Sequence, residues 1–490
     1  MATLSDAIQY TLLEEFLPTI SSQSVFMDPV YAQIKRSSRR VVNRGIGRGH
    51  NVNKTFVIGV SGGAKFTTVA GSNVVSGPDN FNMFDTPQTY PGIDEVTAPA
   101  YFTATIGLIE HRGNFFLPQQ FLRMDQYASS IGSVVGDMMK GVATLIAHQE
   151  AAQFWTDSTY FALGDLGDTS ANVANVSGDT AAVTVDLAGT SAGGKVHRFL
   201  QGMLVDIWDS TGATQRNPGF MIAIDDVDTL NRVITLRRLD GGELQTTTTL
   251  NGGITYGGAG GDNDIIVIRE SLSKGPTNIN TWIKTSGTLF GIDLAIHSSF
   301  KSYVPSAESA ALSESLLNKR YYRFGEGYPG VWLDTAITTN GCLLGLIDNL
   351  DGFVSGSNSQ DGRMRFDRNG EMLKPNLGFS SFNYSFNGRP VTVHTSQFVD
   401  ASTWYGIQLA GGNLVRYVPP GIPGAQSDGE IGNELEFTAP IKGASNSIFM
   451  HALSGGKPTD FVQAPFLRQW NTLPNDPRSM KLTGITEITA

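Results

Sequence analysis

The chain has 490 residues, which gives room for two or three domains, and only 16% of them are charged, while 56 are glycine. This composition is typical of β-rich, turn-rich proteins with large uncharged surfaces, and the net charge of −10 excludes a chain that binds nucleic acid along its whole length. Cys342 is the single cysteine, so intrachain disulfides and cysteine-based metal sites are excluded as well.

The first fifty residues combine a short amphipathic segment with a basic arm. The segment at residues 3–20 lacks the basic-then-apolar order of a signal peptide, and no later window is apolar enough to span a bilayer. We therefore expect a soluble protein made in a cytoplasm. Between Pro29 and Pro78 no residue is acidic, and eight are basic: Lys35, Arg36, Arg39, Arg40, Arg44, Arg48, Lys54 and Lys65. Such an arm contacts phosphates or an acidic neighbouring surface, or it is merely solvated.

Residues 51–116 are predicted to be strands joined by long turns. A strand near residues 53–60 leads away, a tip rich in proline and asparagine follows around residues 78–91, and a strand near residues 97–111 returns. A connection of this length is unusual inside one compact domain. We expect it to reach for a partner.

The longest periodic segment is residues 124–155, which predicts an α-helix of roughly 45 Å. Its large apolar residues form one stripe, and polar residues that include His148 form the opposite stripe, which we expect to face water. A third lane of glycine and alanine would let another backbone approach closely. The alternative is an ordinary long core helix of a large domain.

The second half of the chain is predicted to be β-rich and then mixed. Residues 165–270 alternate strand-like runs with turns, which indicates a small all-β module. Further along, helices are predicted at residues 279–289 and 309–324, strands at 342–347, 389–396 and 404–410, and a last strand with an extended end at 447–471.

No motif predicts catalysis, a cofactor or a metal. Gly59–Gly63 matches the G-x-S-x-G pattern around Ser61, but a strand-like run follows where the nucleophile elbow needs a helix. Asp225, Asp226 and Asp228, like the acidic run Gly260–Asp264, suit turns better than a calcium site, which needs a fuller oxygen shell. The seven histidines never approach a metal-ligand spacing.

The order of these segments resembles the major capsid proteins of tailed double-stranded DNA bacteriophages, with the shell fold named after the Hong Kong phage. The resemblance covers nearly the whole chain and rests on order and spacing. It implies an α+β fold whose parts, in chain order, are an N-arm (1–50), an extended E-loop (51–116), a P-domain spine helix (117–164), a β-rich, barrel-like insertion module with a P-domain strand (165–270), an A-domain (271–450) and a C-terminal P-domain strand and tail (451–490).

The resemblance implies a structural protein, not an enzyme, that polymerises as hexamers and pentamers into an icosahedral shell. The implied partners are other copies of the chain, portal and scaffolding or decoration proteins, and packaged double-stranded DNA bound without sequence preference, with no membrane. We expect contacts between subunits at Arg36, Arg39, Arg40, Arg44 and Arg48 of the arm and at Pro78, Phe81 and Phe84 of the loop tip. Two rivals remain: a β-rich fibre or adhesin, and a hydrolase using Ser61 or the Asp225–Asp228 cluster.

Overall fold

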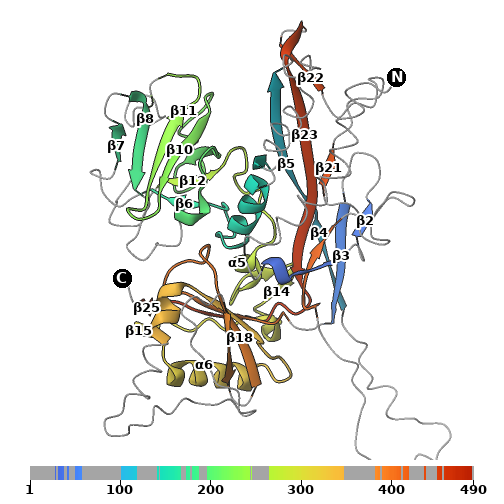
Figure 1. Ribbon diagram of the computed structural model, residues 1–490. Helices are drawn as coiled ribbons and strands as arrows, with labels where there is room; N and C mark the ends of the chain where they lie inside the picture. The colour runs from blue at the N-terminus through green and yellow to red at the C-terminus, as the bar shows by residue number, and fades with distance from the viewer. Residues whose placement is uncertain are drawn as a thin grey trace, which may run out of the picture.

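A computed structural model describes the fold, which is mixed, with few helices and many strands (Figure 1). The residues it describes are 28, 31–37, 41–43, 50–57, 101–118, 141–142, 144–166, 173–176, 179–186, 196–242, 244, 264–346, 381–386, 389–409, 412–418, 435–437, 450–454 and 457–487. Within this part of the chain each helix is too short or too polar to cross a bilayer.

A six-stranded sheet is built around one very long strand, β23 (Lys457–Pro474). Its partners come from distant parts of the chain: β1 (Lys35–Ser37), β5 (Ile109–Pro118), β20 (Leu414–Tyr417), β21 (Leu435–Phe437) and β22 (Met450–Ser454). β5 runs antiparallel to β23 from the pair Phe461–Pro118 to the pair Trp470–Ile109. The two strands form the tall ribbon along one side of the molecule in Figure 1.

A seven-stranded sheet forms a module beside this ribbon, in the order β6-β12-β9-β10-β11-β8-β7. The strands are β6 (Gly164–Asp165), β7 (Val173–Val176), β8 (Asp179–Asp186), β9 (Leu204–Trp208), β10 (Ile222–Asp228), β11 (Val233–Arg238) and β12 (Ile265–Ile268). A short 3-10 turn, η5 (Val196–Arg198), precedes β9. These strands pair only with one another among the described residues, but their apolar side chains share one core with the helix that precedes them.

A third unit contains a five-stranded sheet in the order β17-β18-β16-β19-β24, with α6 (Glu314–Gly327) against it (Figure 1). The strands are β16 (Thr335–Thr338), β17 (Ser381–Phe386), β18 (Arg389–Thr395), β19 (Trp404–Ile407) and β24 (Met480–Leu482). The helix begins at Ser313, whose hydroxyl accepts from the Leu316 amide, and it buries Leu317, Tyr321 and Phe324 at helical spacing. The helix predicted at 309–324 is confirmed from Glu314 onward, and the strands predicted at 389–396 and 404–410 are confirmed by β18 and β19.

Smaller elements connect these units. A three-stranded sheet contains β2 (Val41–Asn43), β3 (His50–Val57) and β4 (Tyr101–Gly107). The remaining elements are α5 (Ile279–Trp282), β13 (Thr288–Leu289), β14 (Ile292–Asp293), β15 (Ala310–Ala311), β25 (Ile485–Thr486) and the turns η2 (Tyr31–Gln33) and η6 (Ser298–Phe300). β3 and β4 overlap the predicted outgoing and returning strands and pair antiparallel with each other, while the helix predicted at 279–289 ends after one turn.

The long helix differs from its predicted orientation. Residues 141–142 and 144–154 are helical, and every residue from Ile146 to Ala152 is buried. His148, which we predicted to face water, is 4% exposed and packs edge-on against Phe398, with ring centroids 5.2 Å apart. The prediction was wrong here because the module, the N-terminal residues and the ribbon's sheet cover this end of the helix from several sides.

The predicted strand at residues 342–347 is also wrong, since residues 340–346 are helical. The Thr339 hydroxyl accepts from the Cys342 amide and the Thr339 carbonyl accepts from the Leu343 amide, so Thr339 starts a helix. A short apolar run buried on several sides has no period that distinguishes strand from helix. The Cys342 thiol lies in the core of the third unit, where burial raises its pKa to about 11.

Candidate assembly interface

The described part of the N-terminal arm is bound to the rest of the molecule. β1 pairs in parallel with β20, which places the backbone of Arg36 opposite that of Arg416. The other predicted contact residues lie outside the described residues: Arg39, Arg40, Arg44, Arg48, Pro78, Phe81 and Phe84. Ser61 also lies outside the described residues. The contacts of these arm and loop-tip residues with a neighbouring subunit stay predictions.

Asp28 anchors the arm through three hydrogen bonds. This fully buried carboxylate accepts from the Trp155 indole N–H at 2.8 Å, from the Ser396 hydroxyl at 2.6 Å and from the Tyr31 amide at 3.0 Å. The donors come from the end of the long helix, from the segment after β18, and from the arm itself. One carboxylate therefore joins three segments that are far apart in the sequence.

Glu150 and Arg416 form a second buried link beside it. The Arg416 guanidinium is 3.1 Å from the Glu150 carboxylate and stacks over the Tyr31 and Trp470 rings, at 5.1 and 4.9 Å from their centroids. The Tyr31 hydroxyl also donates to Glu150 at 3.1 Å, and His111 Nδ1 of β5 lies 3.5 Å from it. Buried charges of this kind are tolerated only when paired and hydrogen-bonded. We call these residues together with Asp28 the junction.

The junction fixes one end of the ribbon. At about 3.4 Å per residue, the 18-residue strand β23 spans roughly 60 Å, whereas a typical strand has five or six residues. Its last residues, Trp470 to Pro474, are buried in the body of the molecule. The earlier part of the strand pairs with β5, β21 and β22, and carries the sheet away from the junction.

The β3–β4 hairpin presents an uncharged outer face. Thr55 and Thr103 share a hydroxyl hydrogen bond of 3.1 Å, Thr105 donates to Asn53 at 3.1 Å, and Tyr101 is 62% exposed. The inner face packs against the segment around β14 and η6 through Phe56, Ala104 and Phe102. An extended surface with no charge to desolvate suits contact with another protein.

The acidic clusters in the described chain serve turns and ion pairs. Asp228 accepts from the amides of Leu230 and Asn231, Asp225 lies 3.3 Å from Arg237, and the buried Asp264 is bound by Arg216 at 3.0 Å. Among the described residues no group of three histidine, cysteine or acidic side chains is placed to hold a metal ion.

The junction has no signature in the local sequence pattern. In the sequence Glu150 was only one of the charged residues that interrupt the apolar run of the predicted helix, and nothing in the pattern linked it to Arg416, 266 positions away. The one available signal was a charged residue at the most apolar end of the predicted helix. Such a residue needs a buried partner when that end is covered.

We expect acid to destabilise the subunit through His148. Burial lowers the pKa of His148 to about 4 from 6.5, and burial also lowers the pKa values of His197 and His394. The unfolded chain therefore binds a proton between pH 6.5 and 4 that the folded chain does not, so the free energy of unfolding decreases as the pH falls through this range. The shift for His148 corresponds to about 3 kcal/mol.

The measurement is urea unfolding at intervals from pH 7 to 4. His148→Gln should reduce the slope of the free energy of unfolding against pH in this window, because glutamine cannot take up the proton. The variant should change the free energy of unfolding less at pH 7 than at pH 4. An identical slope in the variant and the wild type would contradict the assignment.

Comparison with known proteins gives structural similarity only. No protein-family model matches the sequence, and no curated protein matches it. The capsid asymmetric unit of cyanophage A-1(L) matches at 13% identity and a TM-score of 0.42, covering 94% of this chain and 93% of that one. The capsid of a native GTA particle matches at 10% identity and a TM-score of 0.35, covering 93% of this chain and 89% of that one. A structure from Mycobacterium phage Patience matches at 8% identity and a TM-score of 0.33, covering 98% of this chain and 89% of that one.

The chain is thus similar over most of its length to two solved capsid structures and to a solved structure from a mycobacterium phage. All three TM-scores are below 0.5, and we therefore base the functional proposal on contacts within this chain.

Proposed function

We propose that this chain is the major capsid protein of a tailed double-stranded DNA bacteriophage, a structural protein whose copies assemble as hexamers and pentamers into an icosahedral shell. The observation that carries the proposal is the junction. There, buried charges fix the near ends of the arm and of the long β5–β23 ribbon. Elements that are rigidly held at one end and extended at the other are suited to overlapping neighbouring subunits.

Shell assembly explains this combination physically. A shell must form from contacts that are individually weak and reversible, and many such contacts act together because each closed ring places the next pair of surfaces at high effective concentration. Low surface charge reduces the desolvation cost of each contact, and only 16% of this chain is charged. The implied location is the virion, assembled in a host cytoplasm.

The proposal includes the division given by the resemblance: arm 1–50, E-loop 51–116, spine-helix region 117–164, β-rich module 165–270, A-domain 271–450 and C-terminal segment 451–490. It also includes portal, scaffolding or decoration proteins and non-specific DNA contact as partners. A fibre or adhesin would share the β-rich composition, but it has no need for a basic arm docked at a buried junction.

The test is microscopy of the purified full chain, expressed alone and with scaffolding candidates from the same genome. We expect closed shells or tubes built of hexamers and pentamers. Monomers or small dihedral oligomers under every condition would show that the chain is not a shell protein.

We further propose that the arm acts between subunits more than on DNA. The motivation is the net charge of −10, which provides carboxylates on neighbouring copies, and the pairing of β1, within the arm, with β20 of the same chain. Reversing Arg39 and Arg40 to Glu should reduce shell yield at least tenfold without DNA present, while Lys319→Glu on the exposed side of α6 serves as a control. Normal empty shells that fail to retain DNA would instead assign these residues to the genome.

A further inference from the structure

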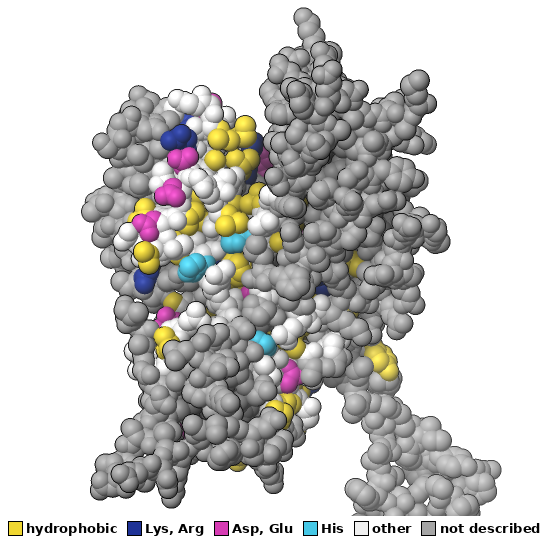
Figure 2. Space-filling view, viewed as in Figure 1, with side chains coloured by type: hydrophobic (Ala, Val, Ile, Leu, Met, Phe, Trp, Pro, Cys, Tyr) yellow, Lys and Arg dark blue, Asp and Glu magenta, His cyan; other side chains and the backbone are white. Residues whose placement is uncertain are grey.

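The β10–β11 hairpin of the module has exposed apolar side chains at both ends. Leu230, in the turn, is 92% exposed, and Met221 and Leu239, at the opposite end, are 41% and 53% exposed. Three of the seven large apolar residues that are exposed in the described chain therefore belong to this hairpin. Figure 2 shows hydrophobic side chains gathered on the visible face of this module.

The turn holds Leu230 in one position. Asp228 accepts from the amides of Leu230 and Asn231, each at 3.0 Å, and from the Asn231 side-chain amide at 2.6 Å. Arg232, with φ of 60°, closes the turn in the left-handed region. A fixed turn loses little conformational entropy when it binds, so Leu230 is a preformed apolar knob.

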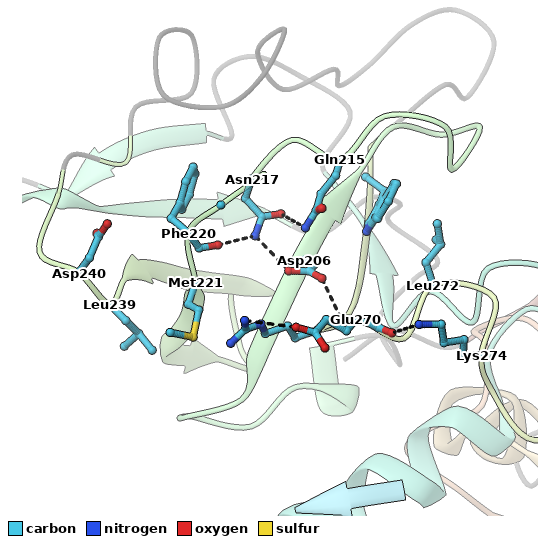
Figure 3. A pocket seen from close by; sticks show the side chains of 13 residues that line it. Asp206, Gln215, Asn217, Phe220, Met221, Leu239, Asp240, Glu270, Leu272 and Lys274 are labelled. Carbon is cyan, nitrogen blue, oxygen red and sulfur yellow. Dashed lines mark hydrogen bonds and ion pairs between the residues drawn. The ribbon is translucent and has the colours of Figure 1, made fainter. Parts of the chain in front are cut away.

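A pocket of about 710 Å³ lies at the opposite end of the hairpin (Figure 3). Met221 and Leu239 lie side by side at one end of it, and Leu272 and Lys274 line the other. The Leu239 amide donates to the Met221 carbonyl at 3.1 Å, which ties the two apolar side chains to the paired strands. The volume admits a turn and not merely one side chain.

The charged groups around the pocket are paired, whereas the Trp208 indole N–H, which lines it, is buried without an acceptor among the described residues. Asp206 accepts from the Asn217 side chain at 3.1 Å and from the Glu270 amide at 2.8 Å. At the rim, Arg238 pairs with Asp240 at 2.5 Å and Arg269 with Glu270 at 3.3 Å. The lining is therefore mixed: it has paired charges, the exposed side chains of Met221 and Leu239, and an indole N–H that lacks an acceptor. This favours a turn over an ion, because a turn brings backbone carbonyls together with an apolar side chain.

We propose that the Leu230 turn of one copy inserts into the Met221–Leu239 pocket of a neighbouring copy. The knob and the pocket cannot meet within one chain, because Asp228 pairs with Val233 at the turn while Ile222 pairs with Arg238 at the pocket, and the seven residues of β10 separate them by roughly 20 Å. A surface that fits a different surface of the same molecule makes a head-to-tail contact, which closes into rings or continues as an array. This contact deepens the proposed shell function by naming one interface, and it rests on that function only for its biological setting.

The first experiment uses cysteine pairs in the full chain. The native Cys342 is buried with a raised pKa and gives a silent background. Chains with Leu230→Cys mixed with chains with Leu239→Cys should form disulfide-linked dimers under mild oxidation, whereas either variant alone should not. Both changes in one chain should give a ladder of larger multimers. Crosslinking of Leu230→Cys chains alone, or no crosslink in any fraction, would overturn the head-to-tail contact.

The second experiment measures the contribution of the knob. Leu230→Asp should reduce the yield of assembled product at least tenfold, because it replaces the apolar side chain of the turn with a charge. Ile296→Asp is the matched control, since Ile296 is 73% exposed and lies outside the hairpin. Shells that form without the crosslink would remove this contact and leave the proposed function standing. Crosslinks without shells under any condition would support this contact and remove the proposed function.

Discussion

Replacing Arg416 with Met is expected to destabilise the subunit by about 3–5 kcal/mol, the usual cost of leaving a buried charge without its ionic partner. Glu150 has no exposed surface, and Arg416 is 2% exposed. The variant removes the charge 3.1 Å from the Glu150 carboxylate and the cation stacked on Tyr31 and Trp470. The measurement is the urea midpoint of the purified full chain, followed by tryptophan fluorescence, because Trp470 reports on this environment.

The matched variant is the double change Glu150→Gln with Arg416→Met. It removes both charges and keeps a hydrogen-bonding side chain for the Tyr31 hydroxyl, so it should recover at least half of the lost stability. If the double variant is as unstable as Arg416→Met alone, packing rather than charge pairing is the main contribution of this arginine.

Replacing Asp28 with Ala is expected to release the arm while the rest of the subunit stays folded. The change leaves the Trp155 indole, the Ser396 hydroxyl and the Tyr31 amide without their common acceptor. Each buried donor without an acceptor costs about 1–3 kcal/mol, so undocking the arm becomes easier than keeping it in place. The amides of β1, whose bonds to β20 depend on that docking, should then exchange with solvent at least tenfold faster.

Hydrogen exchange of peptides covering residues 31–37 measures this release, with peptides from β19 as the internal reference. Asp225→Ala is the matched control, because that carboxylate is 41% exposed and pairs with Arg237 at the module surface. Equal protection of β1 in Asp28→Ala and wild type would mean that the arm is held by its apolar contacts alone. If the arm acts between subunits, the Asp28 variant should also form fewer shells.

Much of the local structure could be predicted from the sequence. Strand β11 and helix α6 follow period-2 and period-3.6 patterns that bury one face, and α6 overlaps its predicted range. The strand-like runs that contain β3 and β4 could be recognised on either side of a long turn-rich stretch, whereas their pairing with each other came from the structure. The turn role of Asp228 followed from the turn preference of aspartate.

Only the tertiary structure decided which residues meet. Local periodicity describes one element without its neighbours in space. It therefore predicted that His148 faces water, whereas other segments cover that side of the helix. It predicted a strand at residues 342–347, where Thr339 starts a helix. The junction brings Asp28, Glu150 and Arg416 together from separate segments, and such pairing depends on chain topology, which has no local signal. Composition and segment order determined the kind of protein to expect. The tertiary structure decided how the arm and the β5–β23 ribbon are held, because the buried charges that hold them pair with residues far away in the sequence.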